Sequence, residues 1–264
     1  MNRISLFGVE IDRLNMEEAV ETILETSADR STCRFVVTPN LDHAVLLQKH
    51  EGLQSVYRDA SLVLADGWPV VLASRLFGRA LPERVTGSDL APALFDQAQR
   101  SNQTLRVYLL GAGPGVAERA AEKIHAKWPV IEVVGCYSPP LGFERDEHEC
   151  QSIVTRINHT NPDLLIVGLG APKQELWVHR HHESLQAGWA LCVGACIDFL
   201  AEEKQRAPRW MQRLCLEWLF RLASEPKRLF KRYLWDAISF PKLLLKECFR
   251  SKQISQPVRE SALP

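Results

Sequence analysis

The segment LRVYLLGAGPGVAE, Leu105–Glu118, joins a continuous apolar run to a glycine-rich loop and then to a helix-forming stretch. An apolar run without polar alternation is typical of a parallel strand covered on both faces. Similar runs stand elsewhere in the chain: RFVVT, SLVLAD, IEVVGCY, DLLIVGLG and WALCVGA. Helix-forming segments separate them, among them Ser88–Arg100, Val116–Lys127 and Cys150–Asn158. This alternation predicts an α/β fold, with a Rossmann-like, mostly parallel sheet that has helices on both faces.

The N-terminal residues predict one more strand and a capped helix. The run ISLFGVEI, residues 4–11, is typical of a single strand. A helix is expected to begin at Asn15, where Glu18 stands three residues on and completes a capping box. We assign residues 1–203 to the Rossmann-like core, residues 204–250 to a basic, amphipathic helical appendage, and residues 251–264 to a disordered tail.

Charge is distributed unevenly along the chain. The formal net charge is zero, yet residues 204–252 hold 13 Lys and Arg against four acids. The rest of the chain is therefore acidic. Such asymmetry indicates a polyanionic surface as a partner, either a membrane or a nucleic acid.

The basic segment RAPRWMQRLCLEWLFRLASEPKRLFKRYL, residues 206–234, also carries large apolar side chains. At helical spacing, an apolar stripe runs along one side of a first helix: Met211, Leu214, Trp218, Leu219 and Leu222. Glu217 stands four residues from Arg213 and from Arg221, and Ser224 and Pro226 are expected to end this helix and begin a second one.

Cations that alternate with Trp, Phe and Tyr over two helices are typical of a helix lying on an anionic membrane. Each Lys or Arg near such a surface contributes about 1 kcal/mol, so about five give roughly 5 kcal/mol, enough for reversible attachment. The segment lacks a nucleic-acid recognition motif, so nucleic acid is not expected. The cations expected to contact lipid or a lipid diphosphate are Arg206, Arg209, Arg213, Arg221, Arg228 and Arg232.

Neither a secreted nor a membrane-spanning protein is expected. The seven cysteines form no CxxC pair, as suits a reducing cytoplasm. The N-terminus lacks the apolar centre of a signal peptide, and no run of about 18 apolar residues occurs. We expect a cytoplasmic protein attached peripherally to the inner face of the cell membrane.

Polar residues gather where the predicted strands end. In open α/β sheets, ligands bind outside the carboxyl ends of the strands. Asp66 directly follows one apolar run, and Thr38, Asn40 and Asp42 follow another. Asp-Gly is also a common turn dipeptide, so a plain turn is the alternative for Asp66. The neighbouring polar residues favour a catalytic role for this carboxylate.

The loop GAGPG offers a phosphate site or merely a tight turn. Gly111, Gly113 and Gly115 would let backbone amides approach a nucleotide phosphate at a helix start. The spacing departs from GxGxxG because residue 116 is Val. Taken alone, the loop supports a nicotinamide-dependent oxidoreductase acting on nucleotide sugars as an alternative function.

Two further stretches contain residue types that bind ligands. In GAPKQE, Pro172 ends a strand and a helix opens with Lys173 and Gln174, which can bind phosphate or sugar hydroxyls or form a solvated first turn. The stretch HRHH, residues 179–182, has no carboxylate or cysteine nearby to complete a metal site. No Asp-x-Asp pair occurs either, so no metal and no cofactor are expected.

Taken in order, the motifs resemble the WecG/TagA/CpsF glycosyltransferases, glycosyltransferase family 26. The motifs are TPNLD, ADGWPVV, RVTGSD, LLGAGPGVAE, GAPKQE, VGACIDFLA and the basic segment, spanning about Leu6 to Leu234. Departures from the usual pattern are Ile197 and Glu202 in the VGACIDFLAE stretch, and Cys215 and Phe220 in CLEWLFRL.

The resemblance implies an inverting, metal-independent transfer from a UDP-sugar to a polyprenyl-diphosphate-linked saccharide at the cytoplasmic membrane face. Such enzymes serve bacterial exopolysaccharide, capsule, teichoic acid or common antigen synthesis. By motif position, Asp66 matches the proposed general base and Asp198 a residue near the uracil. Residues around the donor and acceptor are matched by Thr38, Asn40, Arg84 and Gln174.

Several questions stay open at this level. The sequence does not identify the sugar. N-acetylmannosamine, its uronate, glucose and glucuronate are the candidates, because pocket shape rather than motif decides among them. The acceptor saccharide and the oligomeric state are also open, a homo-oligomer included. A membrane adaptor that binds nucleotide without catalysis is a third candidate, and it predicts that Asp66→Asn leaves biological activity intact.

Overall fold

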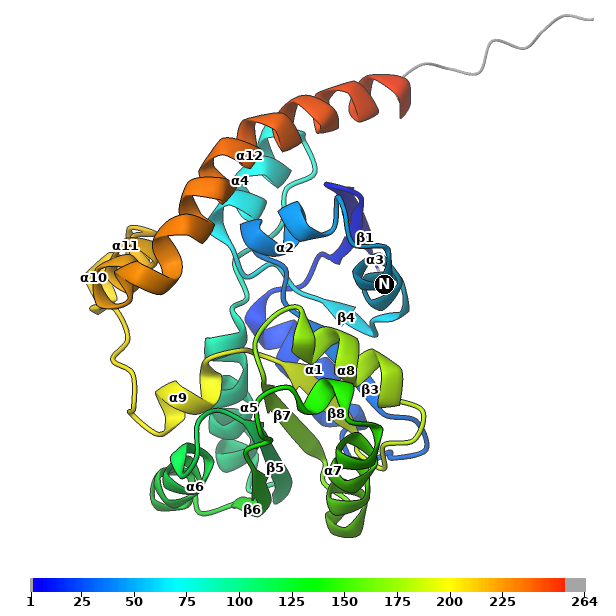
Figure 1. The fold of residues 1–264 in the computed structure, drawn as a ribbon, viewed down its shortest axis with the longest axis vertical. Coiled ribbons are helices and arrows are strands. Elements are labelled where there is room, and N and C mark those ends of the chain that lie inside the picture. The colour runs from blue at the N-terminus through cyan, green and yellow to red at the C-terminus, as the bar shows by residue number, and fades with distance from the viewer. Residues whose placement is uncertain (1, 255–264) are drawn as a thin grey trace, which may run out of the picture.

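A central sheet of six parallel strands, in the order β4-β3-β8-β7-β5-β6, organises the molecule (Figure 1). The computed structural model describes residues 2–254, apart from the side chains of Arg209, Arg213 and residues 251–254. The strands are β3 (Arg34–Val37), β4 (Leu62–Val63), β5 (Leu105–Gly111), β6 (Ile131–Tyr137), β7 (Leu164–Gly168) and β8 (Trp189–Cys192). The predicted Rossmann-like, parallel α/β fold is confirmed.

Alternate residues of the buried strands pack into two separate cores, one on each face of the sheet. In β7, Leu165 and Val167 join one core, whereas Leu164 and Ile166 join the other. The first core is covered by α2 (Leu41–Leu46), α3 (Glu51–Asp59), α4 (Trp68–Leu76), α7 (Glu147–Thr160) and α8 (Lys173–His181), with the short helix η1 (Phe143–Arg145). The second is covered by α1 (Met16–Thr26), α5 (Gly87–Ser101), α6 (Val116–Lys127) and α9 (Cys196–Leu200). Both faces are buried, which explains the uninterrupted apolar runs.

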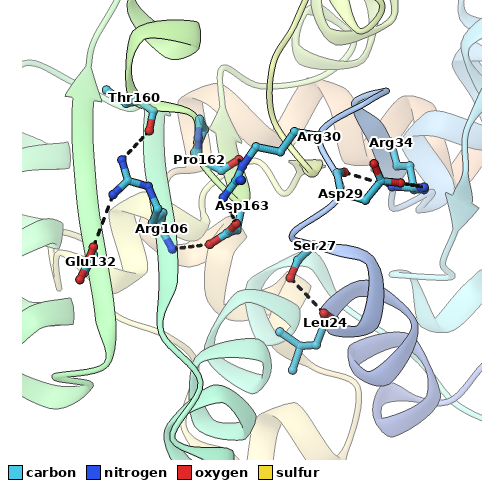
Figure 2. A network of polar contacts seen from close by, with 10 residues as sticks. All are labelled: Leu24, Ser27, Asp29, Arg30, Arg34, Arg106, Glu132, Thr160, Pro162 and Asp163. Carbon is cyan, nitrogen blue, oxygen red and sulfur yellow. Dashed lines mark hydrogen bonds and ion pairs between the residues drawn. The ribbon is translucent and has the colours of Figure 1, made fainter.

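A polar network fixes the edge of the sheet where β5 and β7 begin (Figure 2). Asp163, just before β7, accepts a hydrogen bond of 2.8 Å from the backbone N–H of Arg106 and pairs with Arg30. The Arg106 guanidinium donates to the Thr160 carbonyl at 2.7 Å and lies 3.6 Å from Glu132. These contacts occupy the amino ends of β5 and β7. In open α/β sheets, ligands bind at the opposite, carboxyl ends of the strands.

The N-terminal run 4–11, expected as one strand, is a two-stranded antiparallel hairpin of β1 (Arg3–Leu6) and β2 (Val9–Asp12). The two central turn residues, Phe7 and Gly8, have φ of 54° and 83°. Positive φ at both positions is the geometry of a tight two-residue hairpin turn. Phe7 gives no turn signal in the sequence, and it adopts this backbone while its side chain is buried. The predicted capping box at the start of α1 is confirmed, with Asn15 and Glu18 bonded in both directions.

The C-terminal segment forms three helices: α10 (Arg209–Arg213), α11 (Glu217–Ser224) and α12 (Pro226–Ile254). The expected single helix before Ser224 is therefore wrong. Cys215 has φ of 60°, which breaks the helix between α10 and α11 and removes the continuous apolar stripe. The predicted restart at Pro226 is confirmed. Helix α12 runs past residue 250, and residues 255–264, predicted as a disordered tail, lie outside the described residues.

Helix α12 packs on the core beside α2 (Figure 1). Leu243 is buried in the first core, and Leu229 is also buried. Near the far end of α12, the buried Glu247 accepts a hydrogen bond of 3.0 Å from the backbone N–H of Phe7 and lies 2.8 Å from the Arg79 guanidinium. The appendage is thus tied to the hairpin. No helix among residues 2–254 is both long enough and apolar enough to cross a bilayer.

We expect Glu247→Ala to destabilise the protein by about 2–4 kcal/mol, because it removes charge-assisted hydrogen bonds at a buried position. Chemical denaturation measures this change. The control is Glu203→Ala, which removes an ion pair with Arg119 whose two side chains are both about half exposed, and should cost less than about 1 kcal/mol. Equal effects of the two variants would mean that Glu247 does not anchor α12.

Candidate active site

A cavity of about 420 Å³ opens between the carboxyl ends of β3 and β4 and the C-terminal helices. Its floor comes from the turn after β4, with Asp66, Gly67 and Trp68, and from Asn40 and Asp42 after β3. Helices α11 and α12 supply the opposite wall. The cavity therefore lies where open α/β sheets bind ligands, and the C-terminal segment completes it.

Asp66 is held at this floor by its neighbours in the backbone. Its N–H donates to the Pro39 carbonyl at 3.0 Å, which joins the turns that follow β3 and β4. Gly67 lies against Asn40, so that a Cβ at position 67 would stand 3.2 Å from the Asn40 Cα. Burial raises the pKa of Asp66 to about 6, although the Arg221 and Arg84 cations oppose this rise. Asp66 is thus ionised at neutral pH and can accept a proton there.

Two arginines and one glutamate form a chain beside Asp66. Glu217 lies 3.7 Å from the Arg84 guanidinium and 3.2 Å from that of Arg221. The predicted contact of Glu217 with Arg221 is confirmed, whereas the contact with Arg84 was not foreseen. Both arginines line the cavity. Glu217 and the ionised Asp66 balance the charge of the two guanidinium groups, which keep N–H donors in the cavity wall for an anionic ligand.

Asn40 has a structural task as well as a place in the cavity wall. Its side chain caps α2 by accepting a hydrogen bond of 3.2 Å from the His43 N–H. The buried His43 ring lies 3.4 Å from Glu175, which is fully buried. Burial disfavours the charged form of His43, but the carboxylate of Glu175 outweighs this and raises its pKa. This ion pair joins α2 to α8 beneath Asn40.

Thr38 and Gln174 lie below the cavity rather than in its lining. The buried Thr38 hydroxyl donates to the Cys192 carbonyl at 3.3 Å. Gln174 donates to Glu175 at 2.8 Å and accepts from the Gly194 N–H at 3.2 Å. In this structure these two residues hold strand ends and helices together, and neither is exposed to the cavity.

Gly111 ends β5, Gly113 follows it, and Asp198 lies in α9; all three are outside the lining of this cavity. Gly111 has φ of 116°, and a Cβ there would stand 2.5 Å from the Gly168 carbonyl oxygen. A glycine is therefore required for the approach of β5 to β7, whatever the loop binds. The Asp198 carboxylate lies 3.9 Å from Lys204.

The C-terminal arginines expected to face lipid or diphosphate divide into separate groups. Arg221 and Arg232 line the cavity, and Arg232 lies 3.8 Å from Asp42. Arg206 pairs with Asp89 at 2.5 Å, while its Nε and Nη2 atoms are buried without a hydrogen-bond partner in the described part of the chain. Arg228 pairs with Glu225, also within the appendage. The side chains of Arg209 and Arg213 lie outside the described residues.

The cavity wall also contains residues that the sequence did not assign to a binding site; Trp218 was expected only in the apolar stripe of a helix. Trp68, Trp218, Tyr233 and Phe240 make it strongly aromatic, and the Trp218 and Tyr233 rings meet edge to face at 6.3 Å. Asp236 adds a buried carboxylate from α12. A possible signal for Asp236 was its rarity, since it is one of four acids among residues 204–252.

Potential metal ligands do not cluster in the part of the chain that the structure describes. No three His, Cys, Asp or Glu side chains come together there as a metal site would require. In the HRHH stretch, His179 stacks on His182 and contacts Asp59 at 2.7 Å on the surface.

An acid of raised pKa, flanked by arginines and aromatic rings outside the carboxyl edge of a parallel sheet, defines a class of protein. It is an α/β enzyme suited to a substrate that carries both negative charge and a sugar-like, partly apolar surface.

The chain belongs to the WecG/TagA/CpsF family of glycosyl transferases, whose family model matches residues 4–254. It is 32% identical over 206 residues to an N-acetylglucosaminyldiphosphoundecaprenol N-acetyl-beta-D-mannosaminyltransferase of Bacillus spizizenii, with 78% of this chain and 77% of the relative covered. It is 31% identical over 228 residues to a protein of the same name from Staphylococcus aureus, with 86% and 87% covered. The resemblance seen in the motifs is confirmed, and the protein is a glycosyltransferase.

Proposed function

We propose that this protein transfers a sugar from a UDP-sugar to a polyprenyl-diphosphate-linked saccharide, with inversion at the anomeric carbon. The observation that carries the proposal is Asp66, an acid with a pKa of about 6, placed in one cavity with Arg84 and Arg221. The names of the relatives support N-acetylglucosamine as the lipid-linked acceptor sugar and N-acetylmannosamine as the sugar transferred.

In the proposed reaction, Asp66 takes the proton of the attacking acceptor hydroxyl. That oxygen forms a bond to the anomeric carbon on the face opposite the diphosphate, while the bond from the anomeric carbon to the diphosphate oxygen breaks. UDP leaves with the bonding electron pair, and the proton stays on Asp66 until water removes it. Attack from the opposite face is what inverts the configuration.

The leaving diphosphate gains negative charge, which nearby cations stabilise. Arg84 and Arg221 lie beside Asp66 and line the cavity. We propose that these arginines take the place of a divalent metal ion in neutralising the diphosphate.

Helix α12 supports attachment to an anionic membrane. The side chains of Phe230, Leu234, Ile238, Leu245 and Phe249 recur at helical spacing and are between 50% and 67% exposed. Exposed cations lie beside this stripe, including Lys227, Lys231 and Lys242. The opposite side of α12 packs on the core through Leu243, with Phe240 and Leu244 beside it. An exposed apolar stripe with flanking cations suits the surface of the cytoplasmic leaflet, where the lipid acceptor lies.

The other two candidate functions have less support. The oxidoreductase rested on the GAGPG loop, but the packing of β5 against β7 already requires Gly111, and the family is one of transferases. The adaptor has no use for an acid of raised pKa inside a cavity. Two measurements separate all three functions.

Calorimetric titration in metal-free buffer should give saturable binding of UDP and no response to NAD⁺, because the family is one of glycosyl transferases and the arginines of the cavity suit the UDP diphosphate. Binding of NAD⁺ without binding of UDP would return the oxidoreductase to first place. Loss of UDP binding on removal of divalent cations would contradict the metal-free part of the proposal.

Asp66→Asn should lower kcat by about 10²–10⁴-fold, the usual contribution of a general base, while UDP affinity changes little. In the wild type, kcat/KM should fall as the pH drops through about 6, because only the ionised carboxylate accepts a proton. The matched control is Asp59→Asn, a carboxylate that is 57% exposed on the surface. Unchanged turnover by Asp66→Asn would favour the adaptor.

The double variant Leu234→Glu, Ile238→Glu should weaken binding to phosphatidylglycerol-containing vesicles by about a hundredfold or more, since two exposed apolar side chains no longer enter the interface. Vesicle co-sedimentation measures this. Turnover on a soluble, short-chain acceptor should stay near that of the wild type. The control is Leu141→Glu, which changes a 99% exposed leucine far along the chain from α12. Equal vesicle binding by the wild type and the double variant would contradict the proposed role of α12 in membrane attachment.

A further inference from the structure

Asp236 is a buried carboxylate with an unused hydrogen-bonding capacity. It lies on α12 in the wall of the cavity and is only 6% exposed. Its Oδ1 atom has no hydrogen-bond partner in the described part of the chain. Buried polar groups in folded proteins are nearly always paired, so an unpaired carboxylate at a cavity wall indicates a ligand group that pairs with it.

Asp236 lies at the end of the cavity formed by α2 and α12, and charged groups from both helices surround it. Asp42 and His43 face it from α2, and Arg232 comes from its own helix. Burial, together with the charge of Asp42, raises the pKa of Asp236 to about 6, against the opposing effect of Arg232 and His43. Arg232 lies 3.8 Å from Asp42 and so balances part of that negative charge.

The two ends of the cavity therefore differ in chemistry. At one end, Asp66 and Glu217 are balanced by the guanidinium groups of Arg84 and Arg221, which suit the donor diphosphate. At the other end, Asp42 and Asp236 have the single guanidinium group of Arg232 to balance them, so that an excess of carboxylate would repel a diphosphate. Tyr233 and Phe240 stand beside them in the same wall. Carboxylate oxygens accept hydrogen bonds from hydroxyl and amide N–H groups, and aromatic rings cover the apolar face of a sugar ring.

We propose that Asp236, together with Asp42, forms a subsite that accepts hydrogen bonds from the hydroxyl or acetamido N–H groups of the acceptor sugar. The assignment to the acceptor rests on the proposed function: the helix that carries Asp236 is the one with the exposed apolar and cationic stripe. A sugar that arrives on a lipid reaches the cavity past this helix. The donor diphosphate occupies the arginine end.

The raised pKa of Asp236 also means that its ionised form lowers the free energy of unfolding. A folded-state pKa raised above the ordinary value means that ionisation of Asp236 weakens the fold as the pH rises through about 6. Asp236→Asn removes this ionisation. A carboxylate kept only for structure would show the reverse, because its loss would destabilise the protein at neutral pH.

The test uses the full-length protein and the variant Asp236→Asn, with Asp59→Asn as the surface control. Calorimetry compares two short-chain prenyl diphosphates, one linked to N-acetylglucosamine and one without a sugar. We expect the variant to bind the sugar-linked compound about tenfold more weakly and to bind the sugar-free compound as the wild type does. Its Tm should rise near pH 8, with a smaller gain near pH 5.

Steady-state kinetics supply the second arm, in which the acceptor KM should rise and the donor KM should not. A rise in the donor KM alone, equal weakening for both prenyl diphosphates, or a Tm below that of the wild type near pH 8 would each overturn the proposal. Turnover by the wild type tests the proposed transferase reaction by itself. Because the calorimetry needs no turnover, a failure of that reaction and a failure of the subsite are told apart.

Discussion

The packing of α12 against α2 is the contact on which the site depends. Leu243 enters the core and Glu247 binds the hairpin turn, so the helix is fixed at points well away from the chemistry. Between α11 and this anchor, α12 passes the turn that carries Asp66 and closes the cavity. Without that packing, the carboxyl ends of β3 and β4 would face open solvent, and the burial that raises the pKa of Asp66 would be lost.

Burial acts on two carboxylates in this cavity, and their surroundings separate their roles. Asp66 has arginines beside it, which favour its ionised form, and it stands where the chain turns sharply after β4. Asp236 has Asp42 beside it, which disfavours ionisation, and it has no arginine partner within ion-pair distance among the described residues. These different surroundings suit the two proposed roles, Asp66 as the base for a hydroxyl proton and Asp236 as the acceptor of hydrogen bonds from the sugar.

The sequence predicted the sheet well because most of its strands are buried on both faces and so have continuous apolar runs. The edge strand β6 differs, since only Ile131 of it is buried. It failed at Phe7 and at Cys215, where residues other than glycine adopt positive φ and the break carries no composition signal. Asp66, Asn40 and Arg84 were predicted from motif order and do line one cavity. The bond from Glu217 to Arg84 and the inward position of Asp236 depend on how the C-terminal helices fold back, which no local pattern contains.

The same fold-back explains why one segment is both basic and aromatic. On α12, one side carries buried Leu229, Asp236 and Leu243, and the other carries exposed Phe230, Leu234 and Ile238. Aromatic and aliphatic residues on the first side build the cavity, and those on the second suit a lipid surface. Cations serve both sides, since Arg232 faces Asp42 whereas Lys231 is exposed. In the proposed reaction, a helix with two such sides would set the distance between the membrane and Asp66. A lipid-linked acceptor would then reach the proposed base without a separate carrier.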